Sequence, residues 1–555
     1  SASVADCKSM DWTGVTNAPT FSIGNDFSIY GSLTFSPNMT VNSSSDVYFK
    51  STQTGNTITF SGNSLSKKVE FDGIGGVWSL QDSISCGYGS LVEPLQIRNG
   101  TVNSFGHAIS CGRLLVINSS TLNLATSNVY TTGFSSSMTS NNFNSDNSTI
   151  FLRYSSSSGG GFNSQSNSIN NLVIEMNNSS GYNIEGSGGF NKILVKTGLF
   201  TLNGITSDSI LVDTGQTINI SGTVTVNDYL EMNGTCSLLS NLKGTGTLSS
   251  ATGNILVNHT NIEDVTATGG ASFVANDSYD LGGNSGWTIN STSAKDYYWV
   301  GDGGSWEDGS HWALTSGGAG SGCVPTFQDN VYFDANSFSA TGQTVSISAV
   351  VADCKSMDWS GVTNSPEFDI DNELNVYGSL TFSPNMTVTS NSSYDLNFKS
   401  IQTGNTITFA GNEWKGNISF EGVNGEWTLQ DSLSLNNTYR SILVDEGTLN
   451  TSGNSISTGM FKVRNSATVN MSNTNLYCRH RFRIESLNYN TENSTIYAVG
   501  SVFDEVVSKS NIRLVVMDQS NSADVNGSGS WIGLYQRIDV RGTGVTKLYS
   551  LTSDS

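Results

Sequence analysis

The chain repeats itself at a long fixed interval. VADCKSMDWTGVTN at 4–17 returns as VADCKSMDWSGVTN at 351–364, an offset of 347 residues (351 − 4), and YGSLTFSPNMTV at 30–41 is identical at 377–388. Self-similarity at a fixed period is the signature of tandem architectures. We therefore expect about one and two-thirds units of a longer array, with both ends of the chain falling inside a unit.

We place the first unit at 1–296 and the second at 297–555, each truncated by an end of the chain. The second unit begins with a junction rich in Trp and Gly at 297–347. Within the units a shorter period appears, in which an apolar strand, a polar turn and a second strand follow one another. Examples are LQIRNGTVN (95–103), LVINSSTLN (115–123) and ILVKTGLFTLN (193–203).

Alternation of side chains within these strands indicates one buried and one wet face. Thr, Val, Ile, Phe and Tyr favour strands, and residues that build amphipathic helices are sparse. A spacing of about 20 residues fits coils that stack on one another, so we predict an all-β, parallel β-helix (β-solenoid). Parallel crossovers are nearly always right-handed, and we expect that hand. The alternative is a series of β-sandwich domains joined by hairpins.

Charge narrows the range of partners. The chain has 25 Lys and Arg against 46 Asp and Glu, a net charge of −21 (25 − 46). Such a surface repels nucleic acid and anionic membranes, and it attracts cations, calcium among them. No stretch approaches twenty apolar residues, so we expect no membrane insertion. We therefore predict neither a nucleic-acid partner nor a membrane-spanning segment.

Seven cysteines lie along the chain: Cys7, Cys86, Cys111, Cys236, Cys323, Cys354 and Cys478. Cys86 and Cys111 are 25 residues apart (111 − 86), which is near one coil, and both are replaced in the second unit. We predict a Cys86–Cys111 disulfide and a Cys323–Cys354 disulfide, as suits an oxidising setting. The alternative is that these residues are buried free thiols. Cys236 has no evident partner.

The most unusual segment is YYWVGDGGSWEDGSHW at 297–312. In a functional interpretation Trp299, Trp306 and Trp312 form a platform for sugar rings. The acidic residues among them would then bond hydroxyls or calcium: Asp302, Glu307 and Asp308. In a structural interpretation the three rings close one solenoid and start the next. The position of the segment at a unit boundary favours the structural interpretation.

The succession of segments at 260–289, 297–312 and 322–339 resembles the repeat units of very large secreted surface proteins of Bacteroidota, such as gliding-motility adhesins of the SprB type. These residues carry the resemblance: Trp287, Trp299, Trp306, Trp312, Pro325, Asp329, Phe333 and Asp334. It implies a type IX secretion cargo at the cell surface. The implied partners are extracellular polysaccharide or a solid surface, neighbouring repeat units, and the motility or secretion machinery.

Three short segments are similar to the O-glycosylation motif of these bacteria: DSI at 82–84, DSI at 208–210 and DSL at 431–433. They nominate Ser83, Ser209 and Ser432 as glycosylation sites.

Motifs of enzymatic chemistry are missing from the sequence. It has four histidines and no HExxH, GxSxG or P-loop pattern. Two acidic positions recur between the units, Asp72 as Glu421 and Asp82 as Asp431. A glycosidase on a β-helix uses two carboxylates that face each other, which recurrence between units does not establish. A second acidic set offers calcium ligands, or alternatively turn caps: Asp302, Asp308, Asp329 and Asp334.

We therefore expect a non-enzymatic segment of an extracellular bacterial adhesin or fibre, with no required cofactor, that acts as stalk and multivalent contact surface for attachment or gliding. The alternatives are a secreted polysaccharide-degrading β-helix lyase or glycosidase, and a spacer without any ligand.

Overall fold

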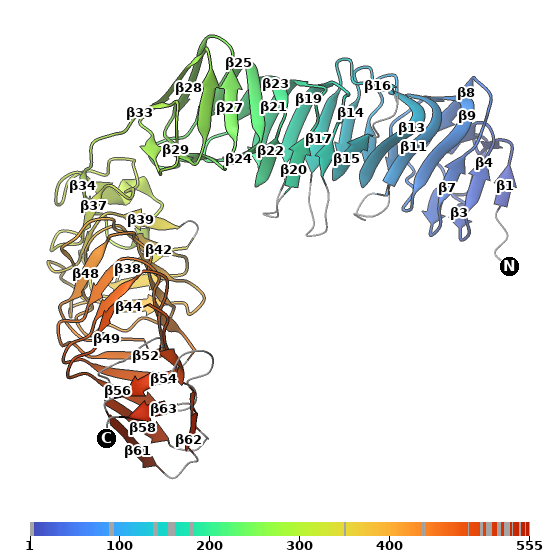
Figure 1. Cartoon of the computed structure of the whole chain (residues 1–555). Helices are drawn as coiled ribbons and strands as arrows, with labels where there is room; N and C mark the ends of the chain where they lie inside the picture. The colour runs from blue at the N-terminus through green and yellow to red at the C-terminus, as the bar shows by residue number, and fades with distance from the viewer. Residues whose placement is uncertain are drawn as a thin grey trace. The chain divides into compact units, whose positions relative to one another are not determined.

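A computed structural model (Figure 1) shows a chain built almost entirely of short strands. It describes residues 5–553 with these gaps: 88–93, 137–141, 154–160, 177–181, 349–350, 436, 438, 487, 500–502, 507–512, 519–522, 527–532, 536, 543–545 and 550. Beyond residue 497 only the backbone is described. The chain divides into two compact units, Ser1–Thr292 and Ser293–Ser555, slightly before the boundary expected from the sequence.

The first unit is a parallel β-solenoid. Its 13-stranded sheet runs through neighbours about twenty residues apart in the chain. The strands used below are β10 (Ile84–Cys86), β12 (Ile109–Cys111), β14 (Asn128–Thr131), β17 (Thr149–Arg153), β19 (Ile169–Glu175), β21 (Phe190–Thr197), β23 (Thr206–Val212), β25 (Thr223–Asn233), β28 (Asn254–Asn258), β31 (Ser272–Asn276) and β33 (Thr288–Asn290).

A second wall of this solenoid is an 18-stranded sheet. Among its strands are β1 (Ala5–Cys7), β4 (Phe27–Ile29), β7 (Val47–Phe49), β9 (Val69–Leu80), β11 (Pro94–Asn103), β13 (Arg113–Asn123), β15 (Gly133–Ser136) and β16 (Asn142–Asn144). In both sheets the paired strands are parallel. Parallel pairing between consecutive coils confirms the predicted β-solenoid, because sandwich domains would pair consecutive strands as antiparallel hairpins.

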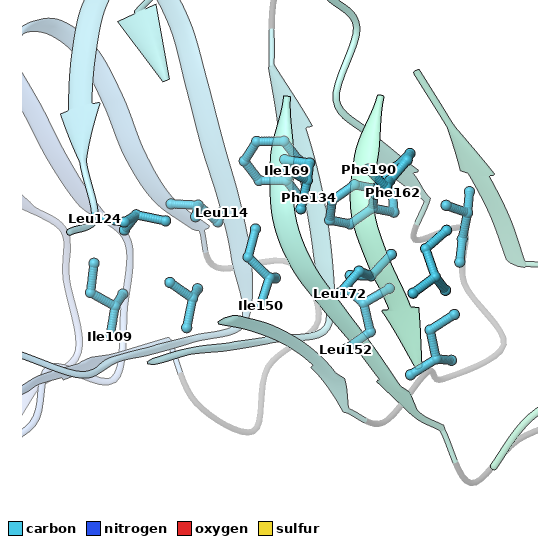
Figure 2. Close-up of a cluster of buried hydrophobic side chains, with 14 of the residues drawn as sticks. Ile109, Leu114, Leu124, Phe134, Ile150, Leu152, Phe162, Ile169, Leu172 and Phe190 are labelled. Atoms are coloured by element: carbon cyan, nitrogen blue, oxygen red, sulfur yellow. The ribbon is translucent and has the colours of Figure 1, made fainter. Parts of the chain in front are cut away.

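The core consists of rows of apolar side chains that stack from coil to coil. On β12, β14, β17 and β19 one inward row contains Ile109, Val129, Ile150 and Leu172, paired in register and fully buried. Figure 2 shows Ile109, Ile150 and Leu172 pointing into the same interior as Phe134 and Phe162 from the opposite wall. Burial of each such side chain contributes about 1.5–3 kcal/mol of hydrophobic stabilisation.

The second unit repeats this construction from its own first strands. The junction supplies β34 (Asp296–Trp299), β35 (Gly304–Ser305), the 3-10 turn η1 (Gly309–His311), β36 (Trp312–Ala313) and β37 (Asn330–Tyr332). The coils that follow include β38 (Thr344–Ile347), β39 (Ala352–Cys354), β41 (Glu367–Ile370), β42 (Leu374–Val376), β45 (Leu396–Phe398), β46 (Asn405–Thr408), β47 (Ile418–Phe420), β48 (Glu426–Leu429), β50 (Ser441–Val444), β51 (Thr448–Asn450), β52 (Ile456–Val463), β53 (Thr468–Asn470), β54 (Asn475–Ile484) and β56 (Thr495–Val499).

The repeat in sequence is also a repeat of packing. Phe49 stacks on Phe71 with ring centroids 4.7 Å apart and planes at 12°, and the equivalent Phe398 and Phe420 stack at 5.0 Å and 14°. Each pair is met edge-on by a buried tryptophan, Trp78 or its counterpart in the second unit. The two units therefore share one internal arrangement, not only a common fold class.

Amide ladders run along the outside, as the Asn-rich turns predict. Asn123 donates from Nδ2 to Oδ1 of Asn103 at 2.6 Å, and Asn144 donates in turn to Asn123. In the second unit Asn470 donates to Asn450 at 2.6 Å, which is the same contact one sequence repeat later. Each amide thus satisfies its neighbour on the adjacent coil.

Candidate functional surface

The three junction tryptophans are buried in the core of the second unit, with Trp299 and Trp312 fully inaccessible and Trp306 1% exposed. Trp312 meets Trp299 edge-to-face at 4.9 Å and Trp306 at 4.7 Å. The indole N–H groups of two of them are satisfied internally, because Trp299 donates to the carbonyl of Asp302 and Trp312 donates to that of Trp306. The prediction that these rings contact a glycan is therefore wrong.

The same rings begin the aromatic core of the second unit. Trp299 stacks on His311 at 4.7 Å on one side and lies 5.8 Å from Phe333 on another. Phe333 in turn stacks on Trp359 at 3.5 Å. Large rings buried where the first coil closes remove more apolar area from water than aliphatic residues would. The structural interpretation of the junction is confirmed for the second unit.

The acidic residues of the junction bind backbone and hydroxyl groups of nearby turns. Asp302 accepts from the amide and hydroxyl of Ser339 at 2.6 and 3.0 Å, and these bonds lower its pKa. Asp308 caps η1 by accepting from the amide of Ser310, which lowers its pKa as well. Glu307 accepts from the hydroxyl of Ser305 and from a backbone amide.

Two further aspartates proposed as calcium ligands have the same role. Asp329 is buried and accepts from the amide of Lys295 and from both the amide and hydroxyl of Thr326. Asp334 accepts from the amide of Asn336. Within the part of the chain that the structure describes, no group of three or more His, Cys, Asp and Glu residues is arranged to hold a metal. The turn-cap alternative describes these aspartates.

The cysteines differ from both predicted pairs. Cys86 and Cys111 are register partners on β10 and β12, as their spacing indicates, but both are buried free thiols. Burial raises the pKa of Cys111 to about 12, and Thr131 is hydrogen-bonded to it. Cys354 is also a buried free thiol, so it is not the partner of Cys323. Cys323 is disulfide-bonded, though not to Cys354. Cys236 is disulfide-bonded as well, so the expectation that it lacks a partner is wrong.

The three nominated glycosylation serines lie in two different environments. Ser83 and Ser432 are exposed, and each hydroxyl accepts one backbone amide of the next coil. Ser209 is only 7% exposed and donates to the carbonyl of Asn191. Its register partners on the adjacent coils are Lys192 and Tyr229, and the register of β23 shifts between residues 207 and 209.

The acidic residues that recur between the units each contact a neighbouring polar group. Asp82 accepts from the amides of Phe60 and Ser61, and Asp431 does the same for Phe409 and Ala410. Asp72 accepts from the amide side chain of Asn99, whereas Glu421 forms an ion pair with Lys399 at 3.8 Å. These contacts give the recurrence a structural cause.

A surface feature that the sequence did not single out is an outward-facing aromatic pair present in both units. Tyr130 on β14 stacks on Phe151 on β17, with centroids 4.9 Å apart and planes at 24°. In the second unit Tyr477 on β54 stacks on Tyr497 on β56 at 4.6 Å and 10°. The two pairs have the same cross-strand register and lie about one sequence repeat apart in the chain.

A network of charges borders the first pair. The guanidinium carbon of Arg153 lies 4.2 Å from the ring centroid of Tyr130, within cation–π range. Its Nε donates to Glu175 on β19 at 3.0 Å, and Lys196 on β21 donates to the other oxygen of Glu175 at 2.9 Å. The Lys196 bond is the main reason that the pKa of Glu175 is lowered.

A shallow open groove of about 530 Å³ continues from Lys196 across β23 and β25. Its lining is almost entirely polar: Lys196, Asp213, Thr214, Gln216, Glu231 and Asn233. With the aromatic pair and Arg153 it forms what we call the outer strip, which follows β14, β17, β19, β21, β23 and β25 in sheet order.

A signal for the aromatic pair exists in the sequence. NVYT at 128–131 matches NLYC at 475–478, and NSTIF at 147–151 matches NSTIY at 493–497. An aromatic residue is retained at the outward position of each strand while its surroundings diverge. Whether this aromatic side chain points outward or inward depends on which residues of the strand face the core. The strand register in the structure determines that.

Searches with protein-family models, against curated proteins and against solved structures find no match to this chain. Among the described residues, no helix has the length and apolar character needed to cross a membrane.

Proposed function

We propose that this chain is a non-enzymatic repeat segment of an extracellular bacterial surface adhesin or fibre, acting as elongated stalk and multivalent contact surface. The observation that carries the proposal is the outward aromatic pair that both units present at the same register, Tyr130 with Phe151 and Tyr477 with Tyr497. A repeated contact gains avidity from repetition, because each further contact of one chain forms at a high effective concentration.

The internal packing supports the stalk role. Rows of stacked side chains join adjacent coils, and the same amide ladder contact occurs in both units. Stability in such repeats comes from each unit and its neighbour, so length can be added without a new core. The partners in this proposal are extracellular polysaccharide or a solid surface, together with neighbouring units and the motility or secretion machinery at the cell surface.

The recurring carboxylates support a non-enzymatic role. Asp82 and Asp431, the most closely matched pair, each hold two backbone amides of a turn. A general acid or nucleophile in a glycosidase faces a second carboxylate across the scissile bond. A carboxylate that already caps a turn is poorly placed for that task.

Antibodies raised against the purified chain test the proposal on cells that produce the protein. We expect labelling of intact cells along surface fibres, and we expect antibody fragments to reduce attachment or gliding. Labelling only after cell lysis would contradict the proposed location. Release of new reducing ends from a polysaccharide by the purified chain would instead support the alternative enzyme.

A further inference from the structure

We propose that the outer strip of the first unit binds a neutral, hydroxyl-rich polysaccharide that lies along the solenoid axis from Tyr130 to Asn233. The inference rests on the proposed contact function and names the ligand class and the surface that would take it. Three observations carry it: the aromatic pair, the donors that Glu175 holds in place, and the chemistry of the groove.

The aromatic pair begins a register row that stays apolar over the next three coils, through Val173, Leu194 and Leu211, before it reaches Glu231 at the groove. Tyr130 and Phe151 are both half-buried, with their stacked rings on the outer face of β14 and β17. The apolar C–H faces of sugar rings pack against aromatic side chains, and Tyr adds a hydroxyl that can bond to the ligand. Retention of the pair in the second unit, where Tyr477 is 38% exposed, indicates a role beyond the local fold of one coil.

Glu175 holds the Arg153 side chain in position and engages only one of its N–H donors. The Arg153 side chain is 46% exposed, and Glu175 engages Nε. A guanidinium has five N–H donors in a fixed fork, and among the described residues no acceptor is bound to its terminal nitrogens. Because Lys196 and Arg153 share one carboxylate, Glu175 orients both cationic groups before a ligand arrives, with Arg153 beside the rings.

The groove offers mixed donors and acceptors with nearly balanced charge. Asp213 and Glu231 are acceptors, Lys196 is a donor, and the amides of Gln216 and Asn233 are both. Counting Arg153 and Glu175, the outer strip has two cations and three carboxylates. Such a lining suits hydroxyl groups, which donate and accept, and it disfavours a polyanion on a chain of net charge −21.

The dimensions favour a polymer over a single sugar. The outer strip crosses six neighbouring strands, from β14 to β25. At about 4.8 Å per strand, five steps span about 24 Å. Contacts spread over that length at an open surface are individually weak, so the ligand is a linear chain of several sugars.

Affinity electrophoresis of the full chain provides the test. The gels contain a neutral glycan (mixed-linkage glucan, xyloglucan or galactomannan), polygalacturonate, or single-stranded DNA. We expect at least one neutral glycan to retard the chain, with no retardation by the two polyanions. Tyr130→Ala and Arg153→Ala should each weaken that retardation about fivefold, and Tyr130→Ala with Tyr477→Ala should abolish it.

Tyr298→Ala is the matched control, because Tyr298 stacks on Tyr332 at 5.0 Å near Asp296 and Asp358, in the second unit and outside the outer strip. It should leave retardation unchanged. Thermal melting confirms that each variant is folded, and Arg153→Ala removes an exposed side chain that the core does not need. Three outcomes would overturn the inference. In the first, no neutral glycan retards the chain; in the second, both Tyr130→Ala and Arg153→Ala are retarded as much as the wild type; in the third, a polyanion retards the chain more strongly than a neutral glycan. Antibody inhibition of attachment, if it persists in that case, leaves the contact function standing with a different ligand.

Discussion

A Cβ atom at Gly425 would lie 2.0 Å from the carbonyl oxygen of Ser400, on the preceding coil, and 2.6 Å from the tip of the Trp427 indole. The first unit has the same arrangement, with Gly76 against the carbonyl of Ser51 at 2.1 Å. A buried tryptophan and the turn of the neighbouring coil leave room at this corner for a hydrogen atom only.

Gly425→Ala should therefore destabilise the second unit. The methyl group has a rigid backbone oxygen on one side and a packed indole on the other, so relief requires the coils to separate. Overpacking of this kind costs about 1–3 kcal/mol. Gly14→Ala is the control, because no atom lies within 4 Å of the added Cβ. Denaturant midpoints followed by Trp fluorescence should fall for Gly425→Ala alone, and equal midpoints would show that the corner can relax.

Asp431 should matter for folding rather than for activity. Asp431→Ala removes the acceptor of two backbone amides, those of Phe409 and Ala410. An amide left without an acceptor costs about 1–3 kcal/mol. Asp431→Asn keeps one carbonyl oxygen and should lose less. The order wild type, Asn, Ala in thermal stability is the expected result, and full stability of Asp431→Ala would exclude the capping role.

The buried thiols should not react with alkylating reagents in the folded protein. Burial raises the pKa of Cys111 and of Cys478 to about 12, and it raises that of Cys86 well above its ordinary value. Since the thiolate is the reactive form, iodoacetamide at pH 8 should label these residues only after denaturation. Cys7 is partly accessible and serves as the positive control. Mass spectrometry of the peptides reads the result, and rapid labelling of Cys111 would mean that the core opens there.

The hydrogen bonds between Asp302 and Ser339 in the junction should be lost in strong acid. Hydrogen bonds from Ser339 lower the pKa of Asp302 below its ordinary value of 3.8. Because the pKa is lower in the folded state, the stabilisation is present above pH 3.8 and is lost as the pH falls through the folded-state pKa. The Ser339 amide should thus stay protected from hydrogen exchange at pH 5 and lose protection in stronger acid. Asp302→Ala removes the acceptor and should lose protection at both pH values, and unchanged exchange in that variant would contradict the assignment.

The fold was predictable because coil stacking imposes a period on the sequence. Strand segments such as the one around Ile97 recur one coil later around Val116, and the structure pairs them in parallel. The amide ladder through Asn123 follows from the same period. Alternation of side chains within a strand then separates core from surface wherever the strand is regular.

What the sequence could not provide is the direction of side chains at irregular positions. Ser209 lies at a register shift and is only 7% exposed, although its motif is typical of an accessible site. Trp306 lies in a Gly-rich segment without any period, so its burial depended on packing against rings such as Phe368. The spacing of Cys86 and Cys111 correctly placed them on adjacent coils, but proximity does not decide whether two thiols are oxidised.

The stacking direction has a mechanical consequence. Thr428 pairs with Asn450 on the next coil, and the backbone bonds between coils run along the solenoid axis. Tension applied to the two ends of a unit would load these hydrogen bonds between coils in series. The coils should therefore detach one at a time rather than all together. Each released coil would add about 70 Å of extended chain at about 3.3 Å per residue. A solenoid of this kind would act as a shock absorber that lengthens stepwise under load.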